Sequence, residues 1–401
     1  MGCYVMHYRA PKPTFSRWDR AKFIAIRVIF PPILLWDLIK IGFSKLLGEG
    51  IGELILPAQK MNFILAMDNP IDYGRLVCKH HIIETYDGAR LDTFELDHQS
   101  QKALESKYQK YIINFVGNAS CYERHIEEMK NDAEVLQANV VGFNFRGVYD
   151  SSGKAKSSED LVTDGIAQVQ RLLDQGVSPQ NITLKGHSLG AGIAALVANH
   201  FHQLKQPINV FNSRSFSTIS DVLVGHIRLE RDEKGLPLGH KESLGKKILG
   251  WLATPFIKLA LALVKWEIKA GAAFRRIPEA YRDYVVVRSK KSERDQRTDD
   301  PIIPHYASIH KALSSERHRK KSEIRKAIDE VARHPKQNKK ALEQAREEIK
   351  NGRKMKTHEE KEDGHNVSLS LLHNQFGKSG QAVFTDFVCR ATEDHAVRKG
   401  P

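Results

Sequence analysis

The stretch Gly186-His187-Ser188-Leu189-Gly190 decides the fold of this 401-residue chain. Residues 181–185 before it have the composition of a short buried strand, and residues 189–200 after it are rich in Ala, Leu, Ile and Val, as a buried helix would be. A serine between a strand and a helix needs a sharp, strained turn, and small flanking residues let the two backbones approach. The stretch therefore predicts a turn that presents the hydroxyl of Ser188.

A G-x-S-x-G turn in this setting is typical of the nucleophile elbow of α/β-hydrolases. The rest of the chain alternates between predicted strands and helices, which favours a mostly parallel sheet covered on both faces. We therefore predict an α/β-hydrolase fold in one large domain with insertions. Strands are expected at 81–85 and 91–96, joined by the Asp87-Gly88 turn, and at 111–116, 140–145, 207–211 and 284–288; helices are expected at 123–137 and 160–174.

The pattern divides the chain into a core and three additions. Residues 69–220 and 282–390 form the hydrolase core, residues 221–281 a cap or lid, and residues 311–356 a charged helical insertion. Residues 1–68 form an apolar and basic N-terminal extension. Its longest charge-free piece, Val28 to Trp36, has nine residues, fewer than the roughly 20 that a membrane span needs. An interfacial arm and a segment packed on the core both remain open.

The predicted cap has an apolar centre over residues 248–266, broken by Lys258 and Lys265. Its spacing predicts an amphipathic helix, with Trp251 and Trp266 at the edges, that suits a lipid surface. A cap helix packed on its own protein is an equally open interpretation.

Composition narrows the compartment and the partners. The net charge is +14, and half of it lies between Lys311 and Glu362, where 17 Lys and Arg face 10 Asp and Glu. A solvated helical surface is the favoured interpretation of this run, with an anionic partner as the alternative. Four cysteines are too sparse for a disulfide framework or a zinc site, and no secretory signal pattern is present. We expect a cytoplasmic or peripheral membrane protein without a nucleic-acid partner.

A serine hydroxyl becomes a nucleophile when a histidine accepts its proton and a carboxylate orients that histidine. In α/β-hydrolases the chain order is Ser, Asp or Glu, then His. Asp300 follows the strand 284–288, and Pro301 behind it is expected to start a helix. Asp295 and Asp299 are alternatives.

The histidine should follow the last strand. His365 lies in an Asp-Gly-His-Asn sequence before a helix predicted at 367–376, and His358 and His373 are alternatives. For the oxyanion, backbone N–H groups are expected from Leu189 and from Asn118, with Ala119 as the alternative. These parts predict acyl transfer through an acyl-enzyme, which requires no metal or organic cofactor.

Several motifs resemble the successive landmarks of BEM46-like α/β-hydrolases, over roughly residues 80–220 and 282–390. The chain departs from that family with Val116 where His is usual, and with a longer distance from Asp300 to His365. The apolar N-terminus and Trp-rich cap resemble the lipase-like SidB group of Legionella effectors, which implies a bacterial protein delivered into a host cell. The landmarks are Asp87-Gly88, Leu91-Asp92, Phe115-Val116-Gly117-Asn118-Ala119, Asn144-Phe145-Arg146-Gly147, Gly186-His187-Ser188-Leu189-Gly190, Asp300-Pro301-Ile302-Ile303-Pro304 and Gly364-His365-Asn366.

The sequence thus predicts a serine hydrolase of carboxylic esters, with lipid acyl esters and an anionic membrane surface as the expected substrate and partner. A soluble thioesterase or small-ester hydrolase is the first alternative. A non-catalytic interaction protein on a hydrolase scaffold is the second, because a fold does not settle a function. The oligomeric state stays open.

Overall fold

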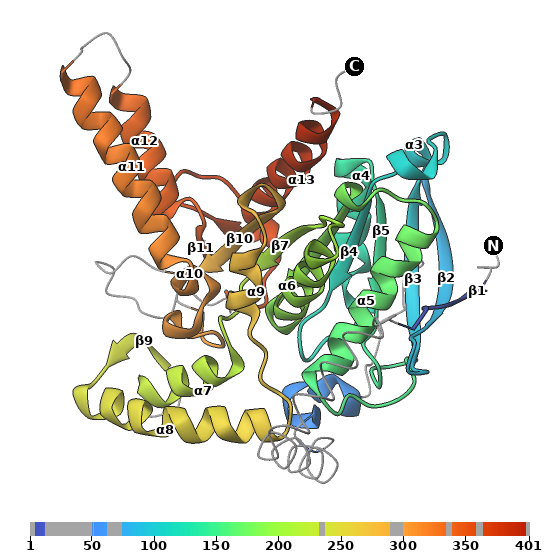
Figure 1. Ribbon diagram of the computed structural model, residues 1–401, viewed down its shortest axis with the longest axis horizontal. Helices are drawn as coiled ribbons and strands as arrows, with labels where there is room; N and C mark the ends of the chain where they lie inside the picture. Colours follow the sequence, from blue (N-terminus) through green and yellow to red (C-terminus); the bar gives the residue numbers. More distant parts are fainter. Residues whose placement is uncertain are drawn as a thin grey trace, which may run out of the picture. The chain divides into compact units, whose positions relative to one another are not determined.

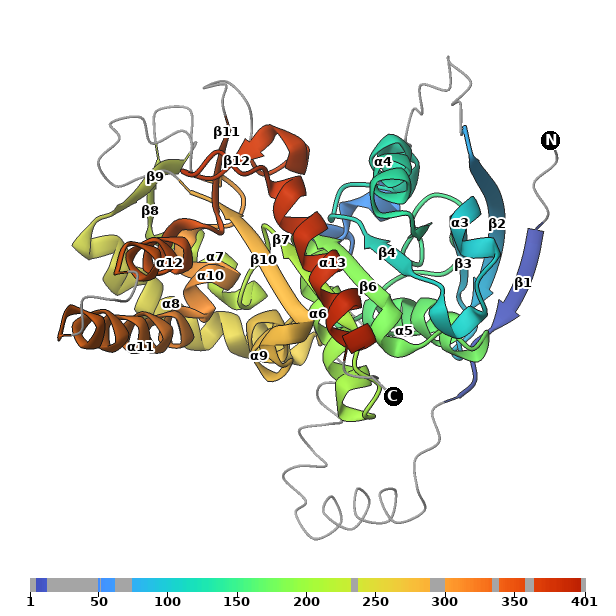
Figure 2. The ribbon, with the colours of Figure 1, turned by 90° about the horizontal axis from the view of Figure 1, so that it is seen from above.

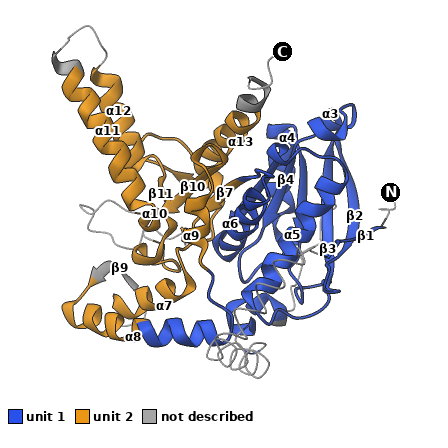
Figure 3. Ribbon diagram, viewed as in Figure 1, with its two compact units in different colours: residues 1–209, 255–268 blue, residues 210–254, 269–401 orange. Residues whose placement is uncertain are grey.

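Alternating strands and helices make up the chain in the computed structural model, which describes residues 5–12, 50, 52–61, 74–231, 237–288, 300–333, 339–357 and 364–397 (Figure 1). The residues group into two units (Figure 3). The first contains Met1–Asn209 and Pro255–Ile268, and the second contains Val210–Thr254 and Lys269–Pro401. Each unit is described by itself below.

The sheet of the first unit has the strand order β1-β2-β3-β5-β4-β6. β4 pairs in parallel with both β5 and β6, whereas β3 is antiparallel to β2 and to β5. β4 and β5 are buried along their whole length, as central strands covered on both faces must be. The strands are β1 (Val5–Arg9), β2 (Leu76–Glu84), β3 (Arg90–His98), β4 (Tyr111–Phe115), β5 (Asn139–Phe143) and β6 (Ile182–His187).

Helices cover both faces of this sheet. α4 (Ile126–Leu136) lies on one face, and α5 (Ser158–Asp174) and α6 (Ser188–Gln203) lie on the other (Figure 2). α5 begins with a capping box between Ser157 and Asp160, and α3 (Gln99–Lys102) is a single turn after β3. The core contains an aromatic cluster in which Phe143 contacts Phe115 and Phe145 with ring centroids 5.1 and 5.2 Å apart.

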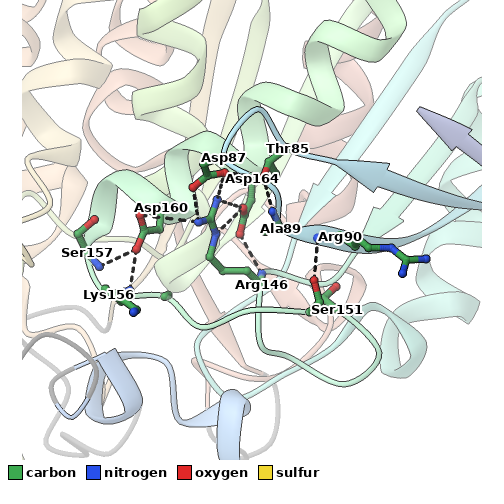
Figure 4. A network of polar contacts seen from close by, with 12 residues as sticks. Thr85, Asp87, Ala89, Arg90, Arg146, Ser151, Lys156, Ser157, Asp160 and Asp164 are labelled. Atoms are coloured by element: carbon green, nitrogen blue, oxygen red, sulfur yellow. Dashed lines mark hydrogen bonds and ion pairs between the residues drawn. The ribbon is translucent and has the colours of Figure 1, made fainter. Parts of the chain in front are cut away.

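The predicted Asp87-Gly88 hairpin is present, and a partly buried ion network anchors its turn. Gly88 has a φ of 93°, and the Thr85 N–H donates to the Ala89 carbonyl at 2.8 Å. Arg146, from the loop after β5, donates to Asp87 (Nη1 to Oδ2, 2.7 Å) and to Asp164 of α5 (Nε to Oδ1, 2.8 Å). The Arg146 backbone N–H also donates to Asp164 at 2.9 Å, so one residue joins the hairpin, the β5 loop and α5 (Figure 4).

The second unit has a sheet in the order β7-β10-β11-β12, parallel except for the β11–β12 pair. Helix α13 packs against β10, and Phe211 on β7 contacts Phe384 and Phe387 of this helix with ring centroids 5.0 and 6.1 Å apart. β8 (Leu229–Arg231) and β9 (Pro237–Glu242) form a separate two-stranded sheet. The main-sheet strands are β7 (Asn209–Ser213), β10 (Arg282–Val287), β11 (Lys354–Thr357) and β12 (Leu372–His373).

The helices of this half include a long apolar one and a charged pair. α8 (Leu244–Leu263) crosses the boundary between the units at Thr254 and contains Pro255. α11 (Ser314–Arg333) and α12 (Lys339–Asn351) lie side by side in both views (Figures 1 and 2) within the predicted charged insertion. The others are α7 (Ile219–Arg228), α9 (Ala270–Arg276), α10 (Ile309–Ala312) and α13 (Gly380–Val397).

Two local predictions are wrong. Residues 367–376 form a 3₁₀ turn at Leu369–Leu371 and then β12, rather than a helix. The Asn374 side chain accepts the backbone N–H groups of Phe376 and Lys378, and Gly377 has a φ of 78°, so a tight turn replaces the helix before α13. Pro301 starts no helix either, since the next helical turn is the 3₁₀ segment His305–Ala307.

The described part of the N-terminal extension packs on the first unit. Leu56 and Ala58 are buried, and the Ala58 N–H donates to the Asn118 carbonyl at 3.2 Å. The sequence pattern also missed β1, which pairs in parallel with β2. Residues 13–49, including the Val28–Trp36 run, lie outside the described residues, and the predicted domain ranges stay predictions.

Candidate active site

Ser188 occupies the turn that the sequence predicts. It is the first residue of α6, directly after β6, and its φ of 51° lies in the left-handed region that a non-glycine residue rarely adopts. Ser188 is buried, with only 5% of the residue exposed to solvent. Backbone strain of this kind costs of order 1–3 kcal/mol and persists where the surrounding packing enforces it.

The two glycines of the motif provide that packing. A Cβ on Gly186 would lie 2.3 Å from Ala191 Cα, and a Cβ on Gly190 would lie 2.2 Å from the Phe115 carbonyl oxygen. Any side chain at either position would push α6 away from the strands. The motif therefore needs small residues because the backbone of α6 lies very close to the strands. The sequence analysis inferred the same reason.

The Gly117-Asn118 loop lies beside the serine. A Cβ on Gly117 would be 3.7 Å from Ser188 Cβ, which places this loop next to the nucleophile candidate. The hydrogen bond from Ala58 to the Asn118 carbonyl holds the loop in position. Leu189 follows Ser188 in the first turn of α6, where backbone N–H groups lack helical acceptors. The assignment of Asn118 and Leu189 to an oxyanion hole stays a prediction.

In the second unit, Asp300 and His365 form the hydrogen-bonded pair that the sequence predicts. His365 Nδ1 lies 2.8 Å from Asp300 Oδ2, and the two side chains are 4% and 6% exposed. The other carboxylate oxygen of Asp300 accepts the backbone N–H groups of Ile302 and Ile303 at 2.9 and 2.8 Å. The Asp300-Pro-Ile-Ile loop thereby fixes the carboxylate, and the carboxylate fixes the imidazole orientation.

Arg214 was not identified from the sequence, yet it holds the histidine loop. It follows β7 with a φ of 55°, and its Nη1 donates to the carbonyls of Gly364 and Val367 at 3.2 and 2.6 Å. Gly364 is needed for space, because a Cβ there would lie 2.8 Å from Val287 Cγ1. The only sequence signal for Arg214 is its place at the carboxyl end of a parallel strand, where sites gather in α/β folds.

The predicted residues thus fall into two groups. Ser188, Leu189 and Asn118 belong to the first unit, and Asp300 and His365 belong to the second. Of the alternatives, His373 lies in β12, while Asp295, Asp299 and His358 lie outside the described residues. Across the described ranges, no group of three or more His, Cys, Asp or Glu side chains is arranged to hold a metal ion.

A cavity of about 260 Å³ in the second unit includes Asp300 in its wall. His305 also lines it and accepts from the Arg288 guanidinium through Nε2. Burial lowers the pKa of His305 to about 3, and the charges of Arg288 and Lys311 add to this shift. His305 is therefore neutral at physiological pH.

We predict that acid destabilises the protein through this histidine. Its folded-state pKa lies below the unfolded value of about 6.5, so the stability it contributes is complete above pH 6.5 and declines as the pH falls toward 3. From pH 7 to pH 5 the loss is about 2 kcal/mol. Urea unfolding at both pH values measures it.

The matched control is His305→Gln, which should show a smaller loss than the wild type over the same pH interval. Asp97 and Asp164 act in the opposite direction, because burial raises the pKa of each to about 6. The difference between wild type and variant is therefore the informative quantity. Equal losses in the two proteins would contradict the prediction.

Comparison with known families and curated proteins gives partial matches. A family model described as Chlamydia CHLPS protein (DUF818) matches residues 18–210, which include the Ser188 turn. A multifunctional-autoprocessing repeats-in-toxin protein of Vibrio cholerae is 24% identical over 153 residues, or 38% of this chain. The chain spans only 3% of the length of that toxin.

Among solved structures, the chain is similar to an alpha-beta hydrolase from Vibrio vulnificus, with 16% identity, a TM-score of 0.41, and coverage of 60% of this chain and 75% of that one. It is also similar to a Pyrococcus furiosus esterase, with 17% identity, a TM-score of 0.35, and coverage of 53% and 70%. The resemblance to BEM46-like proteins and to the SidB group stays a prediction. The strand–serine–helix turn and the mostly parallel, helix-covered sheets give the chain the α/β-hydrolase fold that its sequence predicts.

Proposed function

We propose that the protein is a serine hydrolase that cleaves carboxylic esters, with Ser188 as nucleophile, His365 as general base and acid, and Asp300 as the group that orients His365. The Ser188 hydroxyl adds to the ester carbonyl carbon while His365 takes its proton. His365 then returns that proton to the leaving alcohol, and an acyl-enzyme remains. Water then attacks the acyl-enzyme while His365 takes a proton from it, and the same proton returns to Ser188 as the acid is released.

The observation that carries the proposal is the Asp300–His365 hydrogen bond of 2.8 Å between two buried side chains. Eighteen histidines are present, and this one accompanies a carboxylate that two backbone N–H groups hold in place. The pair also follows the strained Ser188 turn in the chain order that α/β-hydrolases use. A solvated turn aspartate would need no such arrangement.

A fluorophosphonate probe tests the nucleophile directly, because it forms a covalent bond only with an activated serine. We expect labelling of the wild type, none of Ser188→Ala, and full labelling of Ser322→Ala, a matched change at an exposed serine of α11. An unlabelled wild type, or equal labelling of Ser188→Ala, would leave the interaction-protein alternative in place.

The finer part of the proposal is that the substrates are lipid acyl esters met at an anionic membrane surface. α8 carries a row of exposed apolar side chains, among them Trp251 and Phe256, each 74% exposed, and Leu244, 75% exposed. The helix contains three lysines and no acidic residue. An apolar face flanked by lysines suits the boundary between headgroups and acyl chains.

The cap prediction needs one correction, because Trp266 is fully buried and takes no part in an exposed face. No helix within the described ranges is both long enough and apolar enough to cross a bilayer.

Flotation with liposomes checks this role of α8. Trp251→Gln combined with Phe256→Gln should reduce the fraction bound to phosphatidylglycerol liposomes at least tenfold, because two large apolar side chains no longer enter the interface. Val135→Gln, at a 55% exposed position of α4, is the matched control and should bind as the wild type does. Binding that survives the double change would refute the α8 assignment.

A further inference from the structure

The second unit contains a cavity of about 340 Å³ at the amino end of β10, the end opposite to the one that precedes Asp300. Its wall combines the first residues of β10 with residues of α11, α12 and α13. In two views β10 lies between the α11–α12 pair and α13 (Figures 1 and 2). The described lining includes three acidic residues and five basic ones, a net formal charge of +2. The basic residues are Arg282, Arg317, Lys320, Arg353 and Arg390.

Two of the acidic residues are each paired with one of these cations. Glu316 accepts from Arg282 Nη2 at 2.7 Å, and Glu279 forms an ion pair with Lys320. Each pair is electrically balanced. The two pairs therefore hold α11 against the start of β10, but they contribute no net charge to the cavity.

The third acidic residue, Asp283, is shared by two arginines. Arg353 donates to both carboxylate oxygens of Asp283, from Nε at 3.0 Å and from Nη2 at 2.8 Å. Arg390 of α13 donates to the same carboxylate at 3.2 Å, and its side chain is 62% exposed. One carboxylate can cancel only one of the two positive charges. A single positive charge is therefore left over on this side of the cavity.

Arg317 provides the other excess charge. Its Nη1 donates to the His310 carbonyl and to the Tyr284 hydroxyl, and among the described residues Arg317 has no carboxylate partner. Burial raises the pKa of Tyr284, so that hydroxyl is neutral at physiological pH. Arg317 is partly exposed, and its Nε and Nη2 are neither buried nor hydrogen-bonded within the described ranges. The guanidinium therefore keeps its charge and has two donors available for a ligand.

Neighbouring titratable groups respond to the charge of Arg317. Burial lowers the pKa of Lys321 on α11, and Arg317 is the nearby charge that lowers this pKa most. Burial also lowers the pKa of His310, again with Arg317 as the largest contributing charge. Both groups thus sense positive charge that the surrounding carboxylates leave uncancelled.

We propose that this cavity binds a phosphate group through Arg317, Arg353 and Arg390. The two charges that the carboxylates leave over match the charge of a phosphate monoester, which is close to −2 at pH 7.5 because its second ionisation lies near about pH 6. Guanidinium forks suit the oxygens of such a group, because they bind them with paired N–H donors. The cavity volume lies within the roughly 300–1,000 Å³ of small-ligand sites, so an organic part also has room.

This site is independent of the proposed hydrolase function, since none of its described lining residues belongs to the predicted catalytic group. A purely structural cluster would need no excess charge, because α11 and α13 could be attached through balanced pairs like the one between Glu316 and Arg282. The ligand chemistry is that of a phosphate monoester, whether it is carried by a soluble molecule or by a lipid headgroup.

Isothermal titration calorimetry of the full chain at pH 7.5 and constant ionic strength tests the site with inorganic phosphate and with glycerol phosphate. We expect the wild type to bind both. Arg317→Gln and Arg390→Gln should each raise the Kd at least roughly fivefold, because each removes charge-assisted hydrogen bonds to the phosphate. Arg325→Gln is the matched control and should keep the wild-type Kd, since Arg325 is an exposed arginine of α11 outside the described lining.

Arg390 is exposed, so Arg390→Gln should stay folded even if Arg317→Gln does not. Thermal unfolding without phosphate checks this for each variant. A wild type that binds neither phosphate compound, or a Kd that Arg390→Gln shares with Arg325→Gln, would overturn the inference.

Flotation distinguishes the two sources of the phosphate. Phosphatidic acid vesicles present a phosphate monoester, whereas phosphatidylglycerol vesicles present a diester. If the source is a lipid, the wild type should bind the first kind at least roughly fivefold better, and Arg390→Gln should lose this preference. If the source is a soluble phosphate ester, both kinds of vesicle should bind equally while calorimetry still shows phosphate binding. A preference for phosphatidic acid that Arg390→Gln retains would contradict this site.

Discussion

Replacing His365 with alanine is expected to lower kcat for an activated ester by about four to six orders of magnitude. Without the imidazole, the Ser188 hydroxyl loses the base that accepts its proton, and what remains is the contribution of binding and of any oxyanion donors. Stopped assays with p-nitrophenyl butyrate over several hours measure this, with Ser188→Ala as the reference for the lowest rate.

Asp300→Asn should cost about 10⁴-fold in kcat, because the amide cannot stabilise the imidazolium and favours the wrong tautomer of His365. The double variant with His365→Ala should be no slower than His365→Ala alone, since residues that act as a unit are not additive. His358→Ala, His373→Ala and Asp299→Asn are the matched controls, because these residues were alternatives in the sequence. A large loss in one of these controls, with an active His365→Ala, would transfer the role to that residue.

Arg146→Met is expected to destabilise the protein by about 3–5 kcal/mol. Asp164 is fully buried and Arg146 is 5% exposed, so removing the guanidinium leaves a carboxylate without its cation in the interior. Burial raises the pKa of Asp164 to about 6 despite the opposing charge of Arg146, which indicates how costly the bare carboxylate would be. Urea unfolding at pH 7.5 measures the change.

A control and a rescue separate this effect from simple loss of an arginine. Arg90→Met removes an exposed guanidinium near the same turn, one that points away from the network in Figure 4, and should change stability by less than about 0.5 kcal/mol. Arg146→Met combined with Asp164→Asn should recover part of the loss, because no charge is left buried. If Arg146→Met unfolds at the wild-type urea concentration, the ion network contributes nothing to stability.

Local signals identified most of the elements that carry the candidate site. The periodicity around Ser188, 140–145 and 284–288 depends on neighbours in the chain, and each of these regions contains a strand or helix in the structure. The predicted helix over 367–376 is wrong, and the cause is again that the prediction used only the local sequence pattern. Its apolar residues resemble a helix face, but side-chain hydrogen bonds from Asn374 and the conformation of Gly377 favour a turn, and single-residue patterns do not show those bonds.

By itself, the sequence determined the nucleophile turn and the order in which serine, carboxylate and histidine occur. The turn depends on small residues at a few consecutive positions, and the order of the three residues is read directly along the chain. Only the tertiary structure decided that Asp300 bonds to His365, that Arg214 holds the histidine loop, and that Arg146 joins Asp87 to Asp164. These contacts join positions 18–153 residues apart, and their energy comes from burying charges and donors together, which depends on the packed interior and not on any one segment.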